Sequence, residues 1–183
     1  RIARLQLRPI ARADQPNLLK NGSFEREDLA PWRVSSNSRQ PLPKGAVRRV
    51  REGRDGGWCI RLESSDAQAM KKRVLKWTHP THPASLPPGK YILSYDLRVS
   101  QLTPRGPMGS FNSYLRVAPP NAPRSGRNLG QSESRFENSD LPWTRRELIL
   151  TLPDGMQASM VSLQLHQATG TVWIDNVSLL RCE

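Results

Sequence analysis

The sequence is poor in cysteine, in aromatic residues and in long apolar runs, and each shortage excludes a class of protein. Only two of its 183 residues are cysteines, and no Cys-x-x-Cys or Cys/His cluster occurs, which argues against a zinc site. No apolar run approaches the roughly 20 residues that a membrane-spanning helix needs. The sequence also lacks a nucleophile elbow, a phosphate loop and a metalloprotease helix, so it supports no catalytic function.

Acidic residues are also scarce relative to basic ones. The chain has 28 Lys and Arg against 16 Asp and Glu, which gives a net charge of +12. Such an excess favours polyanionic partners: nucleic acid, an acidic polysaccharide or an anionic membrane surface. The alternative is a solvated basic surface without a specific partner. No nucleic-acid-binding motif accompanies the charge, so nucleic acid is the least favoured of these partners.

Short alternating runs separated by turns predict an all-β fold. The clearest strand is residues 91–99, where Tyr91, Leu93, Tyr95 and Leu97 share one face. We expect further strands at residues 17–25, 31–34, 46–50, 58–63, 113–118, 143–152, 159–167 and 171–179. Residues 67–77 fit a helix or a strand, and their neighbours favour a strand. Residues 100–113 and 119–142 are predicted loops. Together these elements predict a two-sheet antiparallel β-sandwich at residues 17–183, preceded by a basic extension at residues 1–16.

The segment Thr171–Leu179 is the one around which the chain is organised. Asp175 interrupts its apolar residues, and a carboxylate in such a strand is costly unless something pairs with it. Asp175 therefore reaches solvent, accepts backbone donors or binds a cation. The segment 17–25 has a similar form, since its apolar run ends in Glu25. We expect these two segments to meet and close the sandwich.

The two cysteines, Cys59 and Cys182, both fall on predicted strands. In an exported β-sandwich they could form a disulfide that ties the C-terminal tail to a strand. Two unpaired thiols are the alternative, because geometry decides the pairing. The chain begins with Arg1, which fits removal of a leader or trimming of a longer chain. We expect a secreted or periplasmic, and in any case extracytoplasmic, location.

Four motifs in order resemble a known family. They are residues 17–25 followed by Trp32, residues 88–94, residues 143–153 and residues 170–179. In this order they are similar to the carbohydrate-binding modules associated with xylanases and glucanases, which belong to the galactose-binding-like jelly rolls. The resemblance covers about residues 17–180. It implies a jelly roll of two antiparallel sheets, a structural calcium ion, and glycan binding on a concave face or at loop tips.

The resemblance also implies where the calcium ion binds. The matching positions are Ser23, through its carbonyl, and Glu25, Glu52, Asp55 and Asp175. Six to eight hard oxygen ligands, several of them carboxylates, suit Ca²⁺. The alternative is that Glu25 and Asp175 pair with arginine or with backbone donors.

A glycan site needs aromatic faces for stacking and polar side chains for hydroxyl groups. Trp32, Trp143 and Trp173 match family positions that are usually structural, so we expect them in the core. Since only 6% of residues are aromatic, basic residues take a larger share of the expected site, which suits a uronate or sulfated polymer. The candidate ligand-binding residues are Trp58, Trp77, Tyr114, Arg61, Lys72, Lys76, Arg98 and Arg116, with a solvated basic face as the alternative for the charged ones.

These observations predict a non-catalytic module that binds a polysaccharide, and an acidic one in particular. The alternative is a structural or accessory subunit of a larger extracytoplasmic assembly, whose jelly roll makes protein contacts. The fold cannot choose between them, because jelly rolls carry unrelated functions.

Overall fold

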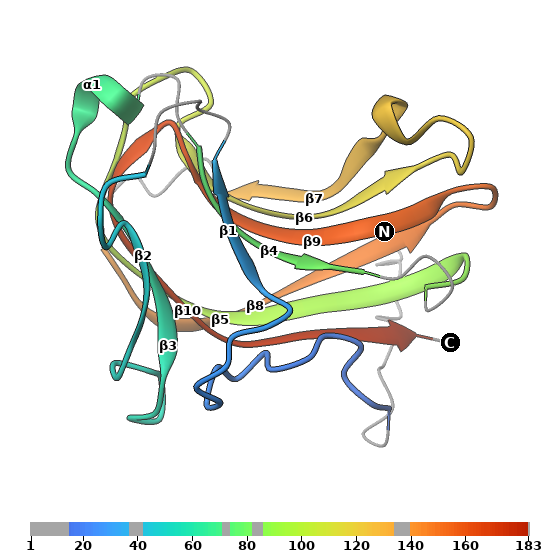
Figure 1. Ribbon diagram of the computed structural model, residues 1–183, viewed down its shortest axis with the longest axis horizontal. Coiled ribbons are helices and arrows are strands. Elements are labelled where there is room, and N and C mark those ends of the chain that lie inside the picture. Colours follow the sequence, from blue (N-terminus) through green and yellow to red (C-terminus); the bar gives the residue numbers. More distant parts are fainter. Residues whose placement is uncertain (1–14, 37–41, 71–73, 82–85, 134–139, 183) are drawn as a thin grey trace, which may run out of the picture.

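The chain folds into two antiparallel five-stranded sheets that face each other, as the computed structural model shows (Figure 1). The structure describes residues 15–36, 42–70, 74–81, 86–133 and 140–182. This arrangement confirms the predicted all-β, two-sheet jelly-roll sandwich.

Each sheet takes its strands from distant parts of the sequence. Sheet A has the order β1-β4-β9-β6-β7, with β1 at Arg33–Ser36, β4 at Val74–Pro80, β9 at Gln157–His166, β6 at Ser110–Ala118 and β7 at Arg127–Glu133. Sheet B has the order β2-β3-β10-β5-β8, with β2 at Val47–Val50, β3 at Cys59–Ser64, β10 at Ala168–Cys182, β5 at Gly89–Pro104 and β8 at Leu141–Leu152.

The core lies between the sheets, where alternate residues of each strand point inward. Tyr91, Leu93, Tyr95 and Leu97 of β5 are all 0% exposed, which confirms the predicted inner face of that strand. Burial leaves a tyrosine hydroxyl in need of a partner. The hydroxyl of Tyr95 meets the Ser113 hydroxyl of β6 at 2.8 Å, so this hydrogen bond joins the two sheets.

The predicted contact between the two ends of the chain is present, although residues 17–25 form turns rather than the expected strand. The Leu18 N–H donates to the Leu179 carbonyl at 3.0 Å, and the Val177 N–H donates to the Gly22 carbonyl at 2.8 Å. In Figure 1 this blue segment runs beside the end of β10. The strand β10 therefore pairs with β3, with β5 and with this irregular segment.

Two further predictions need correction. Residues 67–77 do not form one strand, since α1 covers Ala67–Met70 and β4 begins at Val74. Residues 119–142 are not only a loop: they contain the short 3-10 helix Pro123–Ser125 and the edge strand β7. No helix in the described part of the chain is long and apolar enough to cross a membrane.

Candidate functional site

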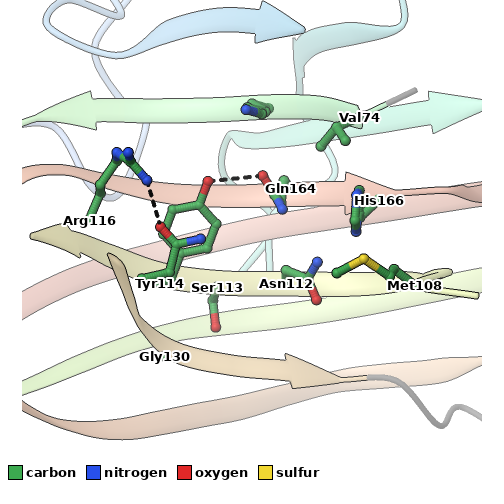
Figure 2. A pocket seen from close by; sticks show the side chains of 11 residues that line it. Val74, Met108, Asn112, Ser113, Tyr114, Arg116, Gly130, Gln164 and His166 are labelled. Atoms are coloured by element: carbon green, nitrogen blue, oxygen red, sulfur yellow. Dashed lines mark hydrogen bonds between the residues drawn. The ribbon is translucent and has the colours of Figure 1, made fainter. Parts of the chain in front are cut away.

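A groove of about 470 Å³ runs over the outer face of sheet A. Its walls come from strands β4, β9, β6 and β7, so its shape depends on their register. Asn112, Gln164 and Lys76 lie opposite one another across β6, β9 and β4. Because side chains alternate along a strand, all three point away from the core residues Phe111 and Leu163. Figure 2 shows Asn112 and Gln164 side by side in the groove.

Tyr114 is the aromatic residue among those that line the groove. Its hydroxyl donates to Gln164 Oε1 at 3.2 Å, which fixes the ring in place (Figure 2). Gly130 lies opposite Tyr114 in the register of β6 and β7. A Cβ at Gly130 would lie 2.2 Å from the Ser113 carbonyl oxygen, a backbone atom that cannot easily move. Glycine therefore lets β7 approach the strand that carries the tyrosine.

The charged residues of the groove are basic. They are Lys76 and Arg116, next to the titratable His166, and none of the eleven described residues around the groove is acidic. Arg116 is oriented by a 3.4 Å hydrogen bond from its Nη1 to Asn128 Oδ1. Burial, and secondarily the charge of Lys76, lowers the pKa of His166 below its usual value, so this imidazole is neutral at pH 7.

Three of the predicted ligand-binding residues lie in this groove: Lys76, Tyr114 and Arg116. Trp77 was predicted as a ligand-binding residue, but it belongs to the core, because it is 3% exposed and its ring stacks on Trp32 with 5.9 Å between ring centroids. Lys72 lies outside the described residues.

The other predicted basic residues, Arg61 and Arg98, lie on sheet B instead. Both pair in register with Trp173, and the Arg98 guanidinium sits 3.9 Å from the centroid of that indole. Glu52 accepts from Trp173 Nε1 at 2.8 Å and from Arg98 at 2.9 Å. These residues therefore contact one another and lie away from the groove.

We predicted that Trp32, Trp143 and Trp173 all lie in the core, and the positions of the tryptophans on sheet B require a correction. Trp32 is in the core, and Trp173 is also buried at 9% exposed, but it lies outside the main core cluster, against the two arginines. Trp143 is half-buried beside Arg98, whose guanidinium lies 5.4 Å from its centroid. Trp58, a predicted ligand-binding residue, is half-buried in the turn before β3, where Arg49 covers its ring at 3.8 Å.

Sequence reasoning missed the polar floor of the groove. Asn112, Gln164, His166 and Asn128 line it, yet none was predicted as a ligand-binding residue. A signal for two of them was present, since Gln164 and His166 alternate with the apolar residues Leu163 and Leu165. Such alternation identifies an outer face, but it does not say which sheet the face belongs to.

The predicted cation site is built around the turn between β2 and β3. Glu25 Oε1 accepts the Trp58 N–H at 2.8 Å. Asp175 accepts the N–H groups of Arg54 at 3.1 Å and Asn176 at 2.7 Å. Backbone donors therefore hold both carboxylates, which is one of the alternatives that the sequence left open.

Asp175 is 4% exposed, and burial raises the pKa of its carboxyl. The nearby carboxylates of Asp96 and Glu25 also raise this pKa, against the two N–H groups that lower it. Asp96 is itself bound by Arg54 at 2.6 Å. A cation beside Asp175 would offset the cost of burying this carboxylate.

The predicted calcium ligands fit this arrangement in part. Glu25 and Asp175 approach the same turn, where Cβ atoms at Gly57 and Gly53 would come within 2.3 Å and 2.8 Å of their oxygens. The carboxylate of Glu52 is held instead by Arg98 and Trp173, so Glu52 could offer only its carbonyl. Within the described ranges, no three His, Cys, Asp or Glu side chains gather as a metal-binding group. The calcium ion, with Ser23 and Asp55 among its ligands, stays a prediction.

The predicted disulfide between Cys59 and Cys182 is contradicted. Both cysteines are free and buried. Cys59 lies next to the Asp175 end of the β3–β10 pair, whereas Cys182 lies at the other end of β10. Seven residues of strand, about 23 Å, separate Asp175 from Cys182, which is too far for a disulfide.

Comparison with known proteins places the fold. No family model and no curated protein matches the sequence. The solved "Family 16 Carbohydrate Binding Module-2" is 16% identical, with a TM-score of 0.60 over 90% of this chain and 100% of that one. The CBM22-1 xylan-binding domain of Paenibacillus barcinonensis Xyn10C is 11% identical, with a TM-score of 0.59 over 92% of this chain and 95% of that one.

A larger protein also contains this fold. The enzymatically active domain of tailspike protein 4 from bacteriophage CBA120 is 14% identical, with a TM-score of 0.58 over 90% of this chain. The chain spans only 21% of that protein's length. At such identities the likeness concerns the fold, and it confirms the resemblance to the jelly roll of carbohydrate-binding modules.

Proposed function

We propose that this protein is a non-catalytic module that binds a polysaccharide in the groove of sheet A, and that the polysaccharide is acidic. The observation that carries the proposal is the lining of the groove: one oriented tyrosine, several amides, two cations and no carboxylate. The fold adds support, because structures of the same fold include the family 16 module and the xylan-binding CBM22-1 domain. Such a module would meet its polymer outside the cytoplasm.

Tyr114 and the amides supply the contacts that any glycan needs. A pyranose ring offers C–H groups on its face, which stack on an aromatic ring, while its hydroxyl groups need donors and acceptors. Asn112 and Gln164 are nearly buried in the floor of the groove, and an amide can both donate and accept. Gln164 Oε1 already accepts from Tyr114 and Asn112 Oδ1 from the Ser110 hydroxyl, so their NH₂ groups would donate to the sugar hydroxyls.

Lys76 and Arg116 supply the selectivity for acidic sugars. Lys76 lies opposite Gln164 and Arg116 opposite Met160, so the two cations are separated by four residues of β9, about 13 Å along the strand. That separation is too large for one carboxylate to bridge, so each cation serves a different sugar. Arginine in particular offers a planar pair of donors that matches a carboxylate.

Binding to neutral, uronate and sulfated oligosaccharides, measured by calorimetry at low and high salt, tests this proposal. We expect binding to one acidic class that persists at high salt. Tyr114→Ala should weaken binding to every ligand by about fivefold or more, since an aromatic contact contributes about 1 kcal/mol. The double variant Lys76→Ala/Arg116→Ala should weaken binding to the acidic ligand and spare any binding to neutral ones.

A matched control removes the same two charges elsewhere. Arg51 and Lys90 are exposed and lie outside the groove, so Arg51→Ala/Lys90→Ala should leave the affinity unchanged. Equal losses in both double variants, or binding to every polyanion that vanishes with salt, would mean that net charge alone attracts the ligand. If no glycan binds at all, the proposal fails and the accessory-subunit alternative is favoured.

A further inference from the structure

A second cavity, of about 480 Å³, lies where the segment 17–26 meets β8 and β10 of sheet B. Its polar side chains come from these three parts of the chain: Asn17, Asn21, Ser23 and Arg26 from the segment, Arg145 from β8, and Asn176 and Ser178 from β10. It shares no lining residue with the groove of sheet A. Whatever it binds therefore does not compete with a glycan in the groove.

The wall of this cavity is held by backbone bonds. The strand β10 is irregular between Asp175 and Ser178, and Asn176 takes a left-handed conformation with φ 48°. Gly22 packs directly on this irregularity, since a Cβ there would lie 1.9 Å from the Val177 carbonyl oxygen. The side chain of Asn17 donates to the same carbonyl at 2.9 Å. The cavity is thus formed before any ligand arrives.

Arg145 is held in place at one side of the cavity. Its Nη1 donates to the Asn176 carbonyl at 2.9 Å, and its Nη2 donates to the Ser94 hydroxyl at 2.7 Å. The nearest carboxylate, Asp96, lies 3.7 Å away and has a closer partner in Arg54 at 2.6 Å. The positive charge of Arg145 is therefore only partly compensated. Because these hydrogen bonds already fix its guanidinium, binding an anion would cost little additional side-chain entropy.

Arg26 provides a second cation at the same cavity. Its side chain is exposed, and its guanidinium has no ion pair within the part of the chain that the structure describes. The described lining contains two arginines and no carboxylate. The side-chain amides donate within the protein, Asn21 Nδ2 to the Asp28 carbonyl and Asn176 Nδ2 to Asp96 Oδ2. The donor set for an oxyanion therefore consists of the two guanidinium groups and the Ser23 hydroxyl.

We propose that this cavity is a separate anion-binding site for an oxyanion group, a carboxylate or a sulfate. Arg26 and Arg145 hold the charge, and the Ser23 hydroxyl donates a further hydrogen bond. The group belongs either to a free ion or to a substituent on a polymer. In the second case the module engages acidic polymer on two faces, so one molecule can connect two polymer segments.

The site can be tested with inorganic sulfate, which needs no glycan and is therefore independent of the proposed function. Sodium sulfate is titrated into the ¹⁵N-labelled protein at constant ionic strength. We expect saturable shifts of the Gly22, Ser23 and Asn176 amides. Arg26→Ala should weaken this binding about tenfold or more, since charge-assisted hydrogen bonds are among the strongest. Arg51→Ala, which removes an exposed charge elsewhere, should leave it unchanged.

In a second titration, a uronate oligosaccharide replaces sulfate and the same amide shifts are followed. This titration uses the Lys76→Ala/Arg116→Ala variant, so that the groove of sheet A makes no charged contact with the sugar. Saturable shifts at the same amides with either probe support the site, and the probe that binds more tightly identifies the source of the anion. The proposal is overturned if neither probe gives saturable shifts there. It is also overturned if Arg26→Ala and Arg51→Ala bind equally well.

Discussion

His79 is a histidine whose charge the fold controls. Its side chain is 5% exposed, its ring packs edge-on against Trp32 at 4.9 Å, and its Nε2 accepts the Lys20 N–H at 3.1 Å. An imidazolium could not accept that hydrogen bond, because both of its nitrogens carry protons. Burial lowers the pKa of His79 below 6.5. The folded protein therefore holds the neutral ring, which fastens the segment before Gly22 to β4.

The stability of the fold should consequently fall in acid. The pKa of His79 is lower in the folded state than the unfolded value of 6.5, so the unfolded chain binds more protons below that pH. The stabilising effect is complete above pH 6.5 and is lost as the pH falls through the folded pKa. Melting temperatures measured from pH 7.5 to 5 should decrease. The pKa of His166 is also lowered, so it adds to the same trend.

Single variants separate the two histidines. His79→Gln should make the decrease in melting temperature between pH 7.5 and 5 shallower, and His166→Gln should do so as well, each by its own share. A melting temperature that does not change with pH, or a slope that is the same with and without His79, would contradict the assignment.

Among the elements, β10 contributes most to the fold of sheet B. It lies at the centre of the sheet and pairs with β3 and β5. Val172, Ile174 and Leu179 on its inner face are all 0% exposed. A strand that is buried and paired on both edges loses both packing and register when its side chains are shortened.

Ile174→Ala should therefore lower the free energy of unfolding by about 2–5 kcal/mol, because it removes buried methyl groups and leaves a cavity. The matched control is Ile149→Ala on β8, where the same side chain is 52% exposed and the expected change is within about 0.5 kcal/mol. Urea denaturation measures both. Equal losses at the two positions would show that the inner face of β10 is not specifically packed.

The sequence could predict those strands in which apolar and polar residues alternate because one face of the strand is buried. Residues 91–99 alternate because one face of β5 meets the core, and the same reasoning identified β3, β8, β9 and β10. The edge strand β7 has little apolar content, since among Arg127–Glu133 only Leu129 is apolar. Its pairing with β6 depends on the neighbouring strand, which a local pattern cannot reveal. The strand predicted at residues 17–25 was wrong for the opposite reason. This segment has apolar residues that are buried, but they lie in turns and not in a strand.

The candidate site was predictable to the same limited extent. Lys76, Tyr114 and Arg116 were identified because they are polar or aromatic residues on predicted strands. Arg61 and Arg98 have the same character but lie on sheet B around Trp173. Sequence alternation identifies outer faces, whereas the assignment of strands to sheets depends on long-range pairing. The same limit explains the wrong disulfide, since the ends of β10 could not be located relative to Cys59.

For the molecule as a whole, we predict that a cation secures the contact between its two ends. If Ca²⁺ bridges Glu25 and Asp175, chelation with EDTA should lower the melting temperature and added Ca²⁺ should restore it. A ligand that binds only the folded state at 100 times its Kd adds about 2.7 kcal/mol of stability. Asp175 is the most direct probe, because burial, and secondarily the neighbouring carboxylates, raise the pKa of the carboxyl that the ion would bind.

Asp175→Asn should abolish the response to Ca²⁺. Asp154→Asn, at an exposed turn, should keep it. A melting temperature that is the same with EDTA and with Ca²⁺ would contradict the calcium site. The two carboxylates would then be held by their backbone donors alone.

The central strand of sheet B is also the last strand along the sequence. On the ribosome, β3 and β5 emerge well before residues 168–182 and have no partner between them until those residues leave the exit tunnel. Long-range pairing of this kind is slow, and unpaired strand edges invite association with other chains. The sandwich thus closes only after translation of β10, and until then the facing edges of β3 and β5 stay unpaired.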